Sequence, residues 1–257
     1  KEMLSGIKIV EICGIGPGPF CAMQLADLGA DVIAVERENA LPLGMTGKPP
    51  ANPIHRGKRS VVADLKSPEG RDLVLKLIES ADVLIEGIRP GVMERLGLGP
   101  QDCQARNPRL VYGRMTGWGQ DGPMAHVAGH DNNYIALSGA LYHSGTANEA
   151  PSSPITLIGD IGGGALYLTI GILAGVLNAR QTGKGTVVDA AIVDGSAHMM
   201  QLMLSLQGRG LLKEQRGKSV HDGSHFYATL RGRQVRGLGL DGVAIPCTAA
   251  EQAGPGG

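Results

Sequence analysis

The chain has 257 residues, 24 basic and 24 acidic side chains, and no formal net charge. Because no block of like charge stands out, the sequence does not favour a nucleic-acid-binding or membrane-binding surface. Eight aromatic residues, 2 Phe, 1 Trp and 5 Tyr, are too few to suggest base-stacking platforms. The length suits one large domain, or one domain plus part of another.

Cysteine spacing and the apolar runs indicate the compartment. The cysteines, at positions 13, 21, 103 and 247, form no CxxC pair. We interpret them as free thiols in a reducing compartment, which predicts a cytoplasmic protein without a metal site. No secretory signal is recognisable. The apolar run 161–177 is as long as a short membrane span, but strand-like segments flank it, so we predict a buried helix.

Strands and helices alternate through the first two-thirds of the chain. The patterns predict strands at 7–12, 31–36, 60–65, 83–85, 110–115 and 186–189. They predict helices at 20–28, from 67 onward, at 90–96, 131–140 and 161–180, and one long helix at 192–208. Ser67 followed by Pro68 is a typical helix start. Strands separated by helices indicate a Rossmann-like α/β domain with a parallel sheet and right-handed crossovers.

A glycine-rich turn, 14–18, follows the first strand and invites a dinucleotide-binding interpretation. The pattern fails, because Pro19 and Cys21 stand where the third glycine would be required. Pro17 and Pro19 also lack the amide donors that hold a pyrophosphate. We therefore prefer a tight turn between strand and helix.

Several cations lie near predicted strand ends. Residues 56–59, Arg-Gly-Lys-Arg, stand just before a strand, Arg37 ends the second strand, and Arg89 and Arg95 follow the next one. Strand ends of a parallel sheet share one edge, where ligands bind. A phosphate-rich, adenine-bearing ligand would suit such cations, and a solvated basic loop would explain the charge equally well.

A histidine and an aspartate, His130 and Asp160, each stand beside glycine where a helix is predicted to begin. Amides at the start of the first helix could stabilise an oxyanion. Asp160 is predicted to cap the second helix, which would hold it ionised. Such a pair can remove a proton from one face of a carbon and return it to the other. A structural role for each residue stays open.

These motifs together resemble the family III CoA-transferase fold group and, within it, the α-methylacyl-CoA racemases. The resemblance covers residues 4–227. It rests on Pro-Gly-Pro-Phe-Cys-Ala at 17–22, Arg-Gly-Lys-Arg-Ser at 56–60, Ala-Gly-His-Asp at 128–131, Gly-Asp at 159–160, Thr-Gly-Lys-Gly at 182–185 and Val-Asp-Ala at 188–190.

The resemblance implies an isomerase of fatty-acid and lipid metabolism that acts through an enolate on 2-methylacyl-CoA thioesters. His130 and Asp160 would be its acid/base groups. CoA would be part of the substrate, with no separate cofactor, and the partner would be a second copy in an interlocked homodimer. The implied CoA contacts are Arg37, Arg56, Gly57, Lys58, Arg59, Arg95, Gly129, Asn132, Asn133 and Tyr134.

Two other functions stay open. Transferases of this fold use an aspartate as a covalent nucleophile, and Asp131 is its counterpart here. The sequence Gly-His-Asp at 129–131 favours the racemases, because transferases usually carry another residue before the aspartate. The third possibility is an inactive, truncated CoA-binding protein.

The end of the chain departs from the family. We expect a large CoA-binding domain at 1–190, a linker helix and the start of a small domain at 191–230, and an aberrant, disordered tail at 231–257. Shifted by one base, codons for 231–236 can encode Ala-Asp-Gly-Lys-Tyr, which resembles the racemase continuation. We therefore hypothesise a frameshift that removes most of the small domain, together with a glutamate that the family places beside the catalytic aspartate.

Overall fold

The structure is a computed structural model that describes residues 2–38, 52–224, 229–230 and 243–244. The chain divides into two compact units, Lys1–Ala140 with Pro154–Met199, and Leu141–Ser153 with Met200–Gly257. Within the predicted tail, the structure describes only strand β8 (Val243–Ala244), which pairs antiparallel with β7 (Thr229–Leu230). The rest of the tail lies outside the described residues.

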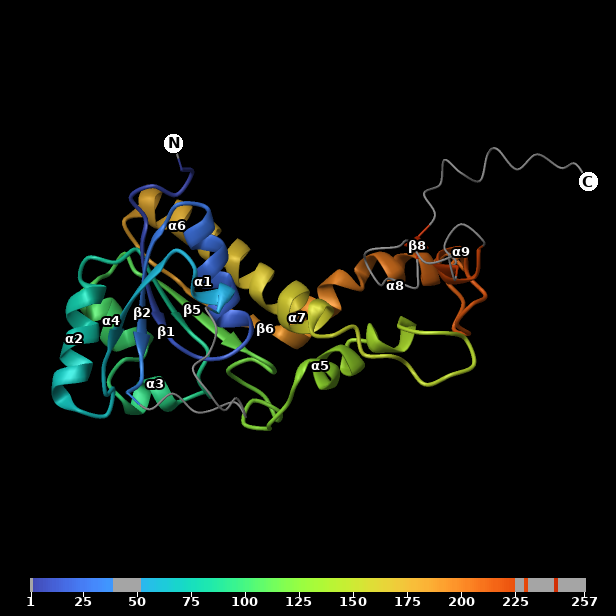
Figure 1. The fold of residues 1–257 in the computed structure, drawn as a ribbon, viewed down its shortest axis with the longest axis horizontal. Coiled ribbons are helices and arrows are strands. Elements are labelled where there is room, and N and C mark those ends of the chain that lie inside the picture. Colours follow the sequence, from blue (N-terminus) through green and yellow to red (C-terminus); the bar gives the residue numbers. More distant parts are fainter. Residues whose placement is uncertain (1, 39–51, 225–228, 231–242, 245–257) are drawn as a thin grey trace, which may run out of the picture. The chain divides into compact units, whose positions relative to one another are not determined.

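A six-stranded parallel sheet forms the centre of the first unit (Figure 1). Its order is β3-β2-β1-β4-β5-β6, which is that of a doubly wound Rossmann sheet. The strands are β1 (Lys8–Ile12), β2 (Asp31–Glu36), β3 (Lys58–Val62), β4 (Val83–Glu86), β5 (Val111–Thr116) and β6 (Val187–Ala191). The predicted Rossmann-like fold is confirmed, although β3 begins two residues before its predicted start.

Helices cover both faces of this sheet (Figure 1). Successive residues of a strand point to opposite faces, so Ile9 packs into one apolar cluster and Val10 into another. This is expected for strands that are buried on both faces. One cluster includes α1 (Pro17–Asp27) and α6 (Leu166–Thr182). The other includes α2 (Pro68–Ile78), α3 (Val92–Arg95) and α4 (Pro100–Arg106). Ser67 caps α2 as predicted, accepting the Gly70 amide at 3.0 Å.

The remaining helices depart from the predicted boundaries. The helix predicted from residue 161 begins earlier, as the π-helix η3 (Leu157–Ala165), which leads directly into α6. The predicted long helix is interrupted at Met200 between α7 (Ile192–Met199) and α8 (Gln201–Gly208). The others are η1 (Pro53–His55), α5 (Asp131–Leu137), η2 (Leu141–His143) and α9 (Val220–Gly223).

The segment Leu157–Thr182 is, by length and composition alone, apolar enough to cross a membrane, and it is the one such helix among the described residues. Leu168, Ile172 and Val176 of this segment pack into the core of the first unit. Its opposite side exposes Ile170 and Leu177. The predicted burial is therefore correct for one face of the helix only.

Backbone-to-backbone contact joins η3 to α7. A Cβ added to Gly195 would overlap the carbonyl group of Gly163, and one added to Gly163 would meet the Gly195 neighbour Ser196. Neither helix could approach the other as closely with a larger residue at these positions. The glycines at 162–164 thus allow the π-helix to pack on α7.

Replacing Gly195 by alanine is therefore expected to destabilise the protein by about 1–3 kcal/mol, because backbone atoms must move to admit the methyl group. Gly208→Ala is the matched control, since Gly208 ends a helix and has open space around its Cα. This control should change stability by less than about 1 kcal/mol. Urea unfolding of both variants measures the difference, and equal stabilities would contradict the proposed close packing.

Candidate active site

The loops after β1 and β4 meet where the strand order reverses. A Cβ on Gly14 would lie 3.9 Å from the Gly87 carbonyl oxygen. Gly16 precedes α1 with φ 70°, and a Cβ there would lie 3.9 Å from Oδ2 of Asp160. Doubly wound sheets bind ligands at this point, outside the carboxyl ends of the strands. Asp160 therefore lies at the edge that the fold offers to a ligand.

His130 is the residue immediately before α5, as predicted, and its side chain is exposed. The His130 amide donates to Oδ1 of Asn133 at 2.9 Å. The His130 carbonyl accepts the amides of Asn133 and Tyr134. Within the described part of the chain, the Asp131 amide donates no hydrogen bond. An unpaired amide at a helix start is a candidate donor to an oxyanion.

An aromatic pair supports the turn that carries His130. The rings of Trp118 and Tyr134 lie edge to face, with centroids 4.7 Å apart. A Cβ on Gly129 would lie 2.7 Å from the Tyr134 ring and 3.0 Å from Nε1 of Trp118, and one on Gly117 would overlap the Tyr134 ring. Sequence reasoning missed Trp118 and Gly117. The single tryptophan of an aromatic-poor chain was the available signal.

Asp160 lies inside the π-helix and does not cap it, so the predicted capping role is wrong. The residue preceding η3 is Thr156, which, like Ile155, has a positive φ, 58° and 52°. β-branched residues rarely adopt this conformation, and both π-helices and such strain are common at functional sites. Asp160 is brought partly inside the protein by this irregular turn.

Partial burial shifts the pKa of Asp160 in the direction opposite to that expected of a capping carboxylate. Burial, and then the nearby charge of Asp131, raise the pKa of Asp160 to about 6, while His130 acts in the opposite direction. Capping would instead have lowered the pKa of this carboxyl. A carboxyl group that titrates near neutral pH can both accept a proton and return it, so the shift suits acid/base chemistry.

Asp131 contacts the backbone of Asp160. Its side chain is 5% exposed, and its Oδ2 accepts the Asp160 amide at 2.6 Å. Oδ1 is buried and has no hydrogen-bond partner among the described residues. The structure therefore brings together His130, Asp131 and Asp160, which the sequence predicted as the catalytic set.

The cations predicted at 56–59 lie at the other edge of the sheet. Lys58 is the first residue of β3 and pairs in register with Val32 near the start of β2. Its buried amine contacts Oε2 of Glu11 at 2.7 Å. Arg56 pairs with Asp27, Arg59 pairs with Asp31, and Gly57 has a positive φ of 72°. The expectation that the backbone of these residues lies at the carboxyl edge is wrong, because residues 56 and 57 precede β3 and residues 58 and 59 open it. Among these four residues, only the Lys58 amine reaches the first turn of α1, where it donates to the Pro19 carbonyl at 2.9 Å.

Other cations do follow strand ends. Arg37 follows β2, Arg89 follows β4, and Arg95 ends α3; all three are exposed. Lys66, which sequence reasoning missed, is exposed on the loop after β3. Its position just before the Ser67 cap was the available signal. These four cations, and not residues 56–59, occupy the connections that lead away from the carboxyl edge.

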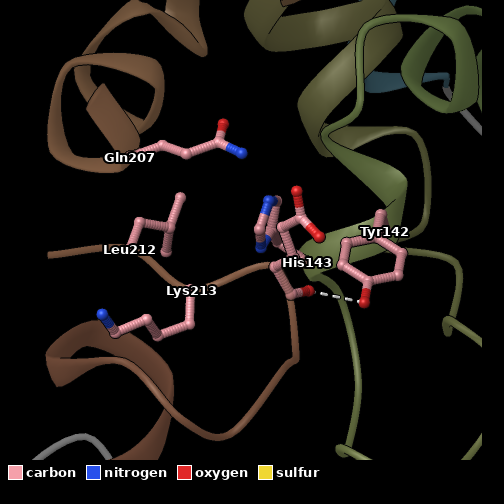
Figure 2. Close-up of a pocket in the computed structure, with 6 residues that line it drawn as sticks. Tyr142, His143, Gln207, Leu212 and Lys213 are labelled. Atoms are coloured by element: carbon pink, nitrogen blue, oxygen red, sulfur yellow. Dashed lines mark hydrogen bonds between the residues drawn. The ribbon is translucent and has the colours of Figure 1, made fainter. Parts of the chain in front are cut away.

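The second unit contains a separate cavity of about 360 Å³ (Figure 2). It is lined by Tyr142, His143, Gln207, Leu212, Lys213 and Glu214. The Tyr142 hydroxyl donates to the Glu214 carbonyl at 2.7 Å. None of the predicted site residues lines it, so the site is defined by the side chains at the sheet edge. The described residues contain no cluster of three His, Cys, Asp or Glu side chains suited to a metal ion.

Fold and site define a doubly wound α/β protein with a histidine and a carboxyl group at the switch point of its sheet. This chain belongs to CoA-transferase family III, which matches residues 4–235. It is 43% identical to the alpha-methylacyl-CoA racemase of Mus musculus, over 95% of this chain and 67% of the relative. It is also 43% identical to that of Homo sapiens, over 89% of this chain and 58% of the relative.

Transferases of the family are more distant. The succinyl-CoA:glutarate CoA-transferase of Homo sapiens is 34% identical, over 74% of this chain and 45% of that protein. Among solved structures, a CaiB/BaiF family protein from Brucella suis superimposes with a TM-score of 0.73 at 33% identity, covering 82% of this chain and 59% of that one. The chain therefore spans about two-thirds or less of the length of each of these four proteins.

Proposed function

We propose that this chain carries the active site of a racemase of 2-methylacyl-CoA thioesters, an isomerase. The observation that carries the proposal is geometric: Asp131, the residue after His130, accepts the Asp160 amide at 2.6 Å, and Asp160 lies at the ligand-binding edge beside Gly16. The 43% identity to two alpha-methylacyl-CoA racemases supports the same conclusion.

The reaction needs two bases and one oxyanion donor. One of the pair, His130 or Asp160, takes the α-proton, and the electrons of the C–H bond move into the thioester to form an enolate. The protonated form of the other residue then gives a proton to the opposite face of the same carbon. The Asp131 amide stabilises the enolate oxygen. The net change is inversion at one carbon, without a redox step or a leaving group.

Exposed cations suit the phosphates of CoA, which form charge-assisted hydrogen bonds with guanidinium groups. We propose that Arg37 and Arg95 bind them, with Lys66 and Arg89, and that Gly129, Asn132 and Asn133 face the CoA chain near the thioester. Tyr134 supports this turn from within, since it is buried. A homodimer, a cytoplasmic location and a place in fatty-acid metabolism belong to the same proposal.

Transfer of CoA between acids is the rival function. It requires a carboxylate that attacks the thioester carbonyl, and Asp131 would have to supply it. In this structure Asp131 is 5% exposed, and one of its oxygens is occupied by the Asp160 amide. A buried, hydrogen-bonded carboxylate is a poor nucleophile, which favours the racemase.

Proton exchange distinguishes the candidates. A 2-methylacyl-CoA incubated with the protein in D2O should acquire deuterium at the α-carbon, and a single enantiomer should become racemic, without any acceptor acid. NMR and chiral analysis measure the two events. Turnover only with an acceptor acid, with an adduct on Asp131, would show a transferase. CoA binding without either reaction would show an inactive binding protein.

A further inference from the structure

The side chain of Asp131 joins the two elements that carry the proposed bases. α5 begins at Asp131, directly after His130, and Oδ2 of Asp131 accepts the Asp160 amide at 2.6 Å. The two residues are 29 positions apart, so the bond is a tertiary contact. The donor of this hydrogen bond is the backbone amide of Asp160, the second proposed base, which lies inside the π-helix.

The surroundings of this carboxylate are closely fitted. A Cβ on Gly159 would lie 2.5 Å from Oδ2 of Asp131 and 3.0 Å from Cγ2 of Ile135. Glycine at position 159 is therefore required for the π-helix to approach α5. Oδ1 of Asp131 is buried, with no hydrogen-bond partner in the described part of the chain. A buried carboxylate with an unsatisfied oxygen is costly, which suggests a role beyond stability.

We propose that Asp131 is a positioning residue, whose carboxylate fixes the backbone of Asp160 relative to His130 so that both bases meet one carbon. The inference rests on the proposed racemase function and describes how that site is held. It also gives this buried carboxylate a function that involves no covalent step.

Two substitutions of Asp131 separate its hydrogen bond to Asp160 from its negative charge. Asp131→Asn keeps an oxygen that can accept the Asp160 amide but removes the negative charge. Asp131→Ala removes both. The charge of Asp131 is the second cause, after burial, of the raised pKa of Asp160. The asparagine variant should therefore keep the geometry and lower this pKa, whereas the alanine variant should lose the geometry as well.

Two NMR measurements test this without any need for turnover. Exchange of the Asp160 amide with D2O should be on the order of tenfold to hundredfold faster in Asp131→Ala than in the wild type, and close to wild type in Asp131→Asn. The Asp160 carboxyl should titrate at lower pH in Asp131→Asn. Asp102→Ala is the control, because Asp102 also accepts a backbone amide, that of Gly99 at 3.1 Å, in another helix; it should leave Asp160 unchanged.

Kinetics add a third measurement. With Asp131→Asn, the α-proton exchange rate should stay within about tenfold of wild type, and the rise of kcat/KM with pH should move to lower pH. Unchanged amide exchange in Asp131→Ala, or abolished activity in Asp131→Asn with a covalent adduct at Asp131 in the wild type, would overturn the inference. A wild-type chain without exchange activity would refute the proposed function, while the NMR measurements would still decide the role of Asp131.

Discussion

Replacing His130 by alanine, or Asp160 by asparagine, is expected to lower racemisation by about 10²- to 10⁴-fold, the usual contribution of a positioned acid/base group. Each variant keeps one base. It should therefore still exchange the α-proton of one enantiomer for deuterium, and it should lose exchange of the other. The two variants should favour opposite enantiomers. Incubating pure R and S thioesters separately in D2O, followed by NMR at the α-carbon, measures this selectivity.

The loop before His130 provides a matched control. His126 is an exposed histidine four residues earlier and makes no described hydrogen bond or ion pair. His126→Ala should leave racemisation and both exchange rates near wild type. If His130→Ala retained racemisation, or if His130→Ala and Asp160→Asn lost exchange of the same enantiomer, the two-base assignment would be wrong.

Periodic apolar patterns made most of the fold predictable. β1, β2, β4 and β5 fall within about two residues of their predicted bounds, because a strand buried on both faces reads as a continuous apolar run. His130 was placed correctly for a related reason. A glycine, a polar residue and then an apolar helix form a recognisable helix start.

Asp160 shows where such patterns fail. The segment 157–165 reads as the start of an ordinary helix, and an aspartate there looks like a cap. The wider turn of a π-helix leaves no clear signature in local composition, and here the helix packs through Gly163 against α7. The capping prediction failed because the helix begins at Leu157, before Asp160.

The predicted cation cluster was assigned to the wrong end of its strand. With the third strand expected at residue 60, residues 56–59 were interpreted as part of the ligand-binding edge. β3 begins at Lys58, and Arg59 pairs in register with Ile33 of β2, so these residues open the strand. In a parallel sheet the two ends of a strand lie at opposite edges. Composition alone therefore could not assign these cations to an edge.

The largest expected loss of stability follows from Arg114→Met. Arg114 of β5 is 5% exposed and Glu86 of β4 is 1% exposed, and Nε of Arg114 lies 3.0 Å from Oε1 of Glu86. Methionine would fill similar space but would leave Glu86 without its cation. Breaking a buried pair on one side usually costs about 3–5 kcal/mol. Urea unfolding near neutral pH should show a loss of this size.

Arg106→Met is the matched control, because Arg106 pairs with Glu79 at 2.9 Å where both side chains are about half exposed. Its loss should be no more than about 1 kcal/mol. If both arginine variants lost the same stability, burial would not be the cause of the cost at Arg114.

The pH dependence of stability tests whether the unpaired charge of Glu86 causes the loss in Arg114→Met. Burial is the main cause that raises the pKa of Glu86 from 4.5 to about 6, against the opposing effects of the Ile88 amide and Arg114. A raised folded-state pKa means that the unfolded chain releases its proton first, so stability falls as pH rises from 4.5 to about 6. Without Arg114 the folded-state pKa of Glu86 should rise further, and the loss of stability with rising pH should continue to higher pH.

The stability difference between Arg114→Met and wild type should therefore be smallest below pH 4.5 and greatest at neutral pH. An equal loss at both pH values would instead assign the cost to the packing of the arginine stem, because a protonated Glu86 needs no cation.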